Sequence, residues 1–108
     1  MRSSADFDIV VLAAVAQLAP EAYGVTIRDR VGLLQGGRIP SVGAVYTALQ
    51  SLERGGLLRA QLGDPSPVRG GRAKRFFSLS AKGVRELTRA REAAQRFVGG
   101  LTPRWKPS

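Results

Sequence analysis

The sequence has 108 residues, a length typical of one domain, and its 17 lysines and arginines against 8 acidic residues give a formal net charge of +9. This charge favours a polyanionic partner over an acidic small-molecule substrate. The sequence has no cysteine, which excludes disulfides and thiolate metal sites, and no histidine, which removes the commonest general base and zinc ligand. We therefore expect no enzyme activity, no metal and no cofactor.

A first helix is predicted from Asp6, whose carboxylate can cap it, to about Leu18, because Pro20 pushes the residue before it out of the helical region. Between residues 9 and 16 this helix is apolar on every side, and a helix of that kind is buried on more than one face. It is either a central core helix, or a helix that contacts its own domain on one face and a second subunit on another.

The apolar run at residues 9–19, broken only by Gln17, is well short of the roughly 20 residues that a membrane helix needs. A signal peptide could have a core of this length, but Asp6 and Asp8 stand where it would carry positive charge. We therefore expect a cytoplasmic protein with no membrane insertion.

A second helix is predicted from a stripe of side chains at helical spacing, formed by Tyr23, Ile27, Val31 and Leu34. Gly36 and Gly37 end it, and Pro40 precedes a third helix that the hydroxyl of Ser41 can cap. The two helices and the short segment between them are typical of a helix-turn-helix pair.

The third helix, residues 41–54, has two different faces. The apolar face is expected to contain Val42, Val45, Leu49 and Leu52, and the opposite face Gly43, Thr47, Gln50 and Arg54. Small side chains let a helix backbone approach a DNA groove closely, while threonine and glutamine offer donors and acceptors to base edges. We interpret this helix as a recognition helix. Tyr46, at the edge of the polar face, is either a phosphate contact or a packing residue.

Two short strands are predicted at residues 57–62 and 74–79, with proline and glycine in the connection between them. Four cations gather at this hairpin, namely Arg69, Arg72, Lys74 and Arg75. Such a cluster favours contact with phosphates or entry of arginine into a minor groove, and the alternative is a solvated turn made basic for solubility. DNA binding through it would weaken steeply with added salt.

Two adjacent aromatic residues, Phe76 and Phe77, stand on the second strand. Neighbouring strand residues point to opposite faces, so one is expected in the core and the other half-exposed. The alternative is a stacking platform for single-stranded nucleic acid.

A fourth helix is predicted after Ser80, which can cap it, with an apolar stripe formed by Val84, Leu87, Ala90, Ala94, Val98 and Leu101. At about 1.5 Å per residue the helix reaches nearly 30 Å, more than a small core can cover. Part of the stripe is therefore expected to pack on a second subunit, the alternative being a helix folded back on its own domain. Residues 102–108, including Trp105, are expected to be a flexible tail.

The predicted organisation is mainly α with a small β-hairpin. Residues 1–80 form a winged helix domain, residues 81–101 a dimerisation helix and residues 102–108 a tail. Seven residues are predicted at the dimer interface: Val10, Ala14, Val84, Leu87, Ala94, Val98 and Leu101.

In order along the chain, several segments resemble the PadR family of winged helix-turn-helix transcriptional regulators, over about residues 7–98. They are residues 22–27 (AYGVTI), 41–46 (SVGAVY), Leu49, 52–54 (LER), 69–77 (RGGRAKRFF), 79–80 (LS) and Gly83. With only one helix after the hairpin, the chain resembles the short members. It departs from the family at Phe76 and Phe77, where tyrosine is common, and at Ser80, where threonine is common.

The resemblance implies a winged helix-turn-helix homodimer, usually a repressor, whose third helix reads the major groove. It implies dimerisation of the C-terminal helix against the first helix of the other subunit. Carried over by position, it implies helix contacts to double-stranded DNA by Ser41, Gly43, Tyr46 and Thr47, and wing contacts by Arg72, Lys74 and Arg75. Gln50 and Arg69 are added from the face and charge arguments above. A small aromatic or cationic effector is a further implication, with no residue assigned to it.

The sequence therefore predicts a sequence-specific, homodimeric DNA-binding regulator, a repressor that binds a palindromic operator through helix 41–54 and the wing at residues 63–75. The alternative is a winged helix module that binds protein through the same uncharged helix face, without sequence-specific DNA binding. The clustered positive charge of the wing favours the DNA-binding regulator, because a protein-binding module does not require such a cluster.

Overall fold

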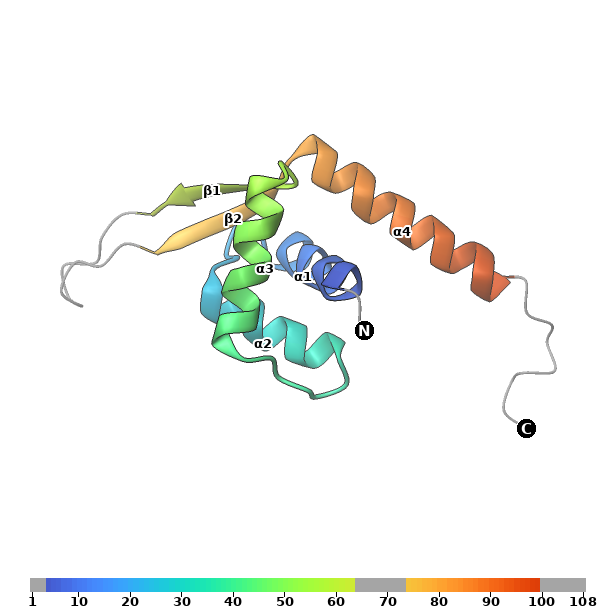
Figure 1. Ribbon diagram of the computed structural model, residues 1–108, viewed down its shortest axis with the longest axis horizontal. Helices are drawn as coiled ribbons and strands as arrows, with labels where there is room; N and C mark the ends of the chain where they lie inside the picture. Colours follow the sequence, from blue (N-terminus) through green and yellow to red (C-terminus); the bar gives the residue numbers. More distant parts are fainter. Residues whose placement is uncertain (1–3, 64–73, 100–108) are drawn as a thin grey trace.

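The computed structural model describes residues 4–63 and 74–99, and over these residues the fold is mainly helical with one β-hairpin (Figure 1). The elements follow in the order α1 (Ser4–Leu18), α2 (Gly24–Leu34), α3 (Val42–Arg54), β1 (Leu58–Leu62), β2 (Arg75–Leu79) and α4 (Ala81–Gly99). This is the arrangement that the sequence predicted. No helix in the described part of the chain is both long and apolar enough to cross a membrane.

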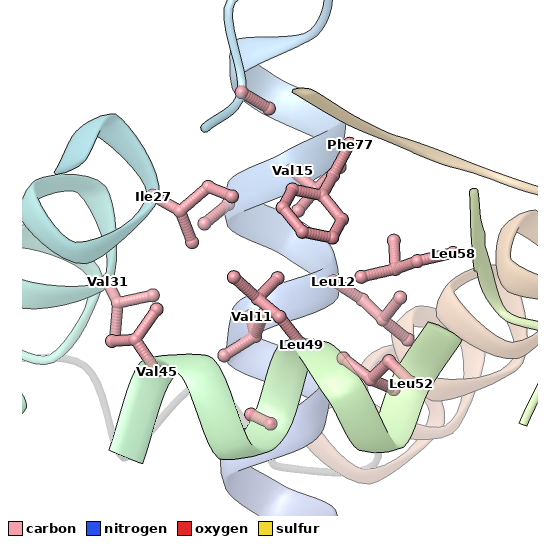
Figure 2. Packing of buried hydrophobic residues seen from close by; sticks show 13 residues of the cluster. Val11, Leu12, Val15, Ile27, Val31, Val45, Leu49, Leu52, Leu58 and Phe77 are labelled. Atoms are coloured by element: carbon pink, nitrogen blue, oxygen red, sulfur yellow. The ribbon is translucent and has the colours of Figure 1, made fainter. Parts of the chain in front are cut away.

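The first helix is the centre of the core. Side chains from α2, α3 and the hairpin converge on Val11, Leu12 and Val15 of α1, as Figure 2 shows. Ala14 of the same helix is also completely buried, so it has no surface with which to contact a second subunit, and the prediction of an interface role for it is wrong. The helix ends at Leu18 as predicted but begins at Ser4, which places Asp6 in the first turn rather than at the cap, where its charge still favours the helix N-terminus.

The second helix is held by its first turn and its last. Thr26 fixes the start of the helix to the segment before it: its Oγ1 accepts a hydrogen bond from the backbone N–H of Tyr23 at 3.0 Å, and its hydroxyl donates to the carbonyl of Glu21 at 2.8 Å. At the other end, Gly36 and Gly37 adopt φ values of 71° and 97°, which side chains disfavour and which end the helix. The expected stripe is half right: Ile27 and Val31 are buried, but Leu34 is 43% exposed.

The third helix begins as predicted, because the N–H of Ala44 donates to Oγ of Ser41 at 3.0 Å. Its buried side chains are Val45, Ala48, Leu49 and Leu52. Val42 is not among them: it is 52% exposed, which corrects the predicted core face. The helix ends at Arg54, and Gly56, at φ 81°, turns the chain towards β1.

The hairpin is antiparallel, with Leu58 opposite Leu79 and Leu62 opposite Arg75. The segment before α2 extends it by a single bridge, since the N–H of Phe77 donates to the carbonyl of Ala22 at 2.8 Å and Tyr23 pairs with Phe76. Phe77 is buried and Phe76 is half-buried against Tyr23, with ring centroids 5.4 Å apart. The prediction of one core anchor and one half-exposed packing residue is therefore confirmed.

The fourth helix leaves the hairpin and extends away from it (Figure 1). Ser80 caps it as predicted, because its Oγ accepts the N–H of Gly83 at 3.1 Å, and the same hydroxyl donates to the carbonyl of Gly56 at 2.6 Å. Gly83 is buried, whereas Val84 and Val98 are 52% and 49% exposed. The first turn of α4 is thus anchored to the domain, and the later turns present apolar side chains to solvent.

Candidate nucleic-acid interface

The outward face of α3 matches the predicted recognition face. Gly43, Tyr46, Thr47, Gln50 and Arg54 are all exposed, and a Cβ placed on Gly43 would have no other atom within 4 Å. Ser41, at the start of the helix, is exposed as well. The backbone of α3 is therefore open to close approach along its first turns, and its exposed side chains up to Gln50 are uncharged.

Tyr46 lies across the beginning of α2. A Cβ on Gly24 would overlap the Tyr46 hydroxyl, so the absence of a side chain at this position is what admits the ring. The first backbone N–H groups of a helix carry partial positive charge, and the Tyr46 hydroxyl stands beside them. Tyr46 is still 48% exposed, so its position combines packing on Gly24 with access to a ligand.

The base of the wing is tied to the helix-turn-helix pair by two cations. Nη2 of Arg75 donates to both carboxylate oxygens of Glu53, at 2.8 and 3.0 Å, and Nζ of Lys74 lies 4.3 Å from the ring centroid of Tyr23. Both cations therefore have partners within the protein, at the end of α3 and at the start of α2. The other two cations of the predicted wing, Arg69 and Arg72, lie outside the described residues.

The connection between α2 and α3 is fixed by side chain to backbone hydrogen bonds. Nε of Arg28 donates to the carbonyl of Pro40 at 2.7 Å, and the amide of Gln35 donates to the carbonyl of Arg38 at 2.9 Å. Ile39 packs closely over Gly32, where a Cβ would come within 2.9 Å of its side chain. These contacts hold α3 at a set angle to α2, which a helix that reads base edges requires.

A groove of about 330 Å³ borders the outward face of α3, because Gly43 and Thr47 line it together with Phe7 and Asp8 of α1. Desolvation by burial raises the pKa of Asp8 above its ordinary value. The Asp8 carboxyl is thus an acidic group beside the exposed face of α3, whose own exposed side chains are neutral or basic.

Another groove, of about 460 Å³, lies between α1 and α4 and is mostly apolar. Among the predicted interface residues, Leu87 and Ala94 line it, Val10 is half-buried against the core, and Val84 and Val98 are exposed on α4. Leu101 lies outside the described residues. The α4 stripe and α1 thus border one common surface.

Sequence reasoning missed three residues that shape the candidate interface: Gly24, Val25 and Glu53. Glu53 belongs to the segment 52–54 quoted for the resemblance, but no local pattern indicated that it pairs with Arg75, which is 22 residues away. Gly24 and Val25 belong to a segment noticed only for its resemblance, and the pattern of apolar residues does not indicate that Val25 is exposed.

Three helices, a hairpin whose base is fixed to the last of them, and an exposed face on α3 define a winged helix-turn-helix domain. The family model of the "Transcriptional regulator PadR-like family" matches residues 11–89. The chain belongs to this family, whose members are transcriptional regulators. No curated protein matches the sequence.

Solved structures share the fold at low sequence identity. A PadR-like transcription factor from Bacteroides fragilis has a TM-score of 0.71 and 20% identity, over 89% of this chain and 86% of that one. A PadR-like transcriptional regulator from Bacillus cereus has a TM-score of 0.68 and 19% identity, over 89% and 86%. PadR of Bacillus subtilis, solved in complex with operator DNA, has a TM-score of 0.64 and 16% identity, over 80% of this chain and 46% of that one.

Proposed function

We propose that this protein is a homodimeric transcriptional regulator that binds a palindromic operator, with α3 in the major groove and the wing against the flanking backbone. The observation that carries the proposal is the exposed face of α3, where Gly43, Thr47 and Gln50 stand together without charge beside a basic wing. A merely solvated helix face would more commonly carry lysine and glutamate. Contacts by Ser41 and Tyr46, and by Lys74, Arg75, Arg69 and Arg72 of the wing, complete the proposed interface.

The proposed dimer uses the apolar groove between α1 and α4 and the exposed stripe of α4. Burial of exposed apolar side chains such as Val84 and Val98 against a second copy would stabilise the dimer. Two-fold symmetry then spaces the two operator half-sites by about one DNA turn or a multiple of it. The division into a DNA-binding domain and a dimerisation helix at about residue 80 belongs to this proposal.

Replacing Val98 by aspartate is expected to turn the dimer into a monomer. Val98 is about half exposed in the protomer, so the substitution leaves the core intact but buries an unpaired charge in the dimer. Light scattering after size-exclusion chromatography measures the mass, and thermal unfolding checks the fold. Ala93→Asp, on the exposed polar side of the same helix, is the matched control and should remain dimeric. A folded, dimeric Val98→Asp variant would place the subunit contact elsewhere.

A dimer on its operator would repress by blocking access to the promoter, and a small aromatic or cationic effector that binds between the subunits would relieve repression.

Fluorescence anisotropy tests the proposed function directly. The labelled duplexes are the DNA upstream of the protein's own gene and a scrambled duplex of equal length, each over a series of salt concentrations. Tight binding to the upstream DNA that persists where the scrambled duplex is released supports a sequence-specific regulator. Equal, salt-labile binding to both favours the protein-binding module.

Glu53→Gln is expected to strengthen binding to DNA of any sequence. The carboxylate holds Arg75 through two hydrogen bonds, and its removal deletes a negative charge and releases a cation at the wing base. The carboxylate competes with phosphate for Arg75, so its removal should strengthen the proposed Arg75–phosphate contact and steepen the log–log salt dependence by up to about one, with little change in stability because the ion pair is exposed. The control is Glu86→Gln, which breaks the exposed pair with Arg89 on α4. Weaker binding by Glu53→Gln would mean that the ion pair positions the wing.

A further inference from the structure

A small apolar recess opens between the first turns of α2 and α3. Its volume is about 80 Å³, and its lining residues are Gly24, Val25, Arg28, Val42, Val45 and Tyr46. Val25 is 63% exposed and Val42 is 52% exposed, so two branched apolar side chains face solvent at this point. Helical spacing predicts Val42 in the core, together with Val45, and the structure instead places it at the mouth of this recess.

The recess is continuous with the candidate DNA interface. Val42 is the first residue of α3 and directly precedes Gly43, whose backbone is open to close approach. Tyr46 belongs both to the recess and to the outward face of α3. A helix that enters a major groove brings its first residues against base edges, so the recess would come to lie over a base pair.

The chemistry of the recess selects among the groups that a major groove presents. Base edges there offer polar donors and acceptors, together with one apolar group, the C5-methyl of thymine. A donor or acceptor pressed against Val25 and Val42 would lose its water without gaining a partner, whereas a methyl group gains by the same burial. A volume of about 80 Å³ admits a methyl group but not a whole base or amino acid side chain.

Arg28 places a positive charge at the same site. Its Nε is bound to the carbonyl of Pro40 at 2.7 Å, which fixes the guanidinium at the edge of the recess. A cation held there favours a nearby DNA phosphate, so attraction to the backbone and apolar contact with a base act at one position of the duplex.

We propose that this recess binds the C5-methyl group of a thymine, with Val42 and Val25 as the residues that specify a T·A pair in each operator half-site. The proposal rests on the proposed function, because it assigns a base to the end of the recognition helix. It assigns specificity to two residues that the polar face of α3 does not include.

The experiment begins with the intact protein and a pool of random duplexes, from which bound sequences are selected and read. In the selected duplex each thymine is then replaced in turn by deoxyuridine, which removes the methyl group and keeps the base pairing. At one thymine per half-site we expect affinity to fall about fourfold, the effect of burying one methyl group, and about fifteenfold when both half-sites are changed. Other thymines of the duplex serve as internal controls.

The variant Val42→Ala is expected to bind thymine and deoxyuridine duplexes equally, because it removes the two methyl groups that contact the base. Leu33→Ala is the control: it shortens an exposed aliphatic side chain, 72% exposed at the end of α2 and outside both the recess and the proposed dimer surface, and it should keep the thymine preference of the wild type. Val25→Ala gives a second, independent loss of that preference. Thermal unfolding confirms that each variant is folded.

The possible outcomes distinguish failure of the proposed function from failure of the thymine assignment. If no sequence is enriched by the wild-type protein, the proposed function fails. If a sequence is enriched but no thymine responds to deoxyuridine, or if Val42→Ala and Val25→Ala both retain the response, then the thymine assignment is overturned and the regulator remains. An enriched sequence with a methyl-dependent thymine that Val42→Ala no longer distinguishes supports the assignment.

Discussion

Gly43→Glu is expected to abolish specific DNA binding while leaving the protein folded. A Cβ on Gly43 meets nothing within 4 Å, so the longer side chain is accommodated by α3 without a clash inside the protein. It would, however, place a carboxylate in the centre of the proposed interface, where it faces phosphates and prevents close approach of the helix. Like charges in such an interface cost several kcal/mol, which corresponds to a loss of affinity of about a hundredfold or more.

Fluorescence anisotropy at constant salt measures this loss. Ala93→Glu changes the net charge equally, at an exposed position on the polar side of α4, and therefore separates a local effect from a general one. We expect Ala93→Glu to weaken binding only slightly. Comparable losses for both variants, or tight specific binding by Gly43→Glu, would contradict the assignment of α3 as the reading helix.

Gly83→Ala is expected to lower the free energy of unfolding by about 3 kcal/mol, the upper part of the range for overpacking. A Cβ on Gly83 would overlap the backbone carbonyl oxygen of Leu57. That carbonyl cannot rotate aside as a side chain would, and it accepts the N–H of Ser80 at 3.0 Å, immediately before α4. The substitution must therefore displace the first turn of α4 from the hairpin.

Urea denaturation at one fixed protein concentration measures the change, because dimerisation makes the apparent stability depend on concentration. Gly43→Ala is the matched control: the same substitution, in another helix, at a glycine with open space around it. It should raise the free energy of unfolding by about 0.5–1 kcal/mol, since alanine favours a helix more than glycine does. Equal effects at the two glycines would mean that α4 is not fixed against Leu57.

Local sequence patterns were sufficient for the elements and their ends. Helical spacing, the capping hydroxyls of Ser41 and Ser80, and the glycines after α2 and α3 predicted the order of elements and most of their bounds. These signals act between residues a few positions apart, so they operate in the same way wherever the helix or strand is later packed. The outward face of α3 was predictable for the same reason.

The sequence alone therefore determined which residues share a helix face and which segments form the winged helix. Tertiary packing decided which of those faces are covered. It buried Ala14 within the protomer, left Val42 exposed at a recess, and placed Arg75 against Glu53. Each of these outcomes depends on elements distant in sequence, such as α1 packing against β2, or α2 and α3 bordering one recess. Periodicity fixes an angle around one helix axis, but only the arrangement of the other elements fixes what lies in that direction.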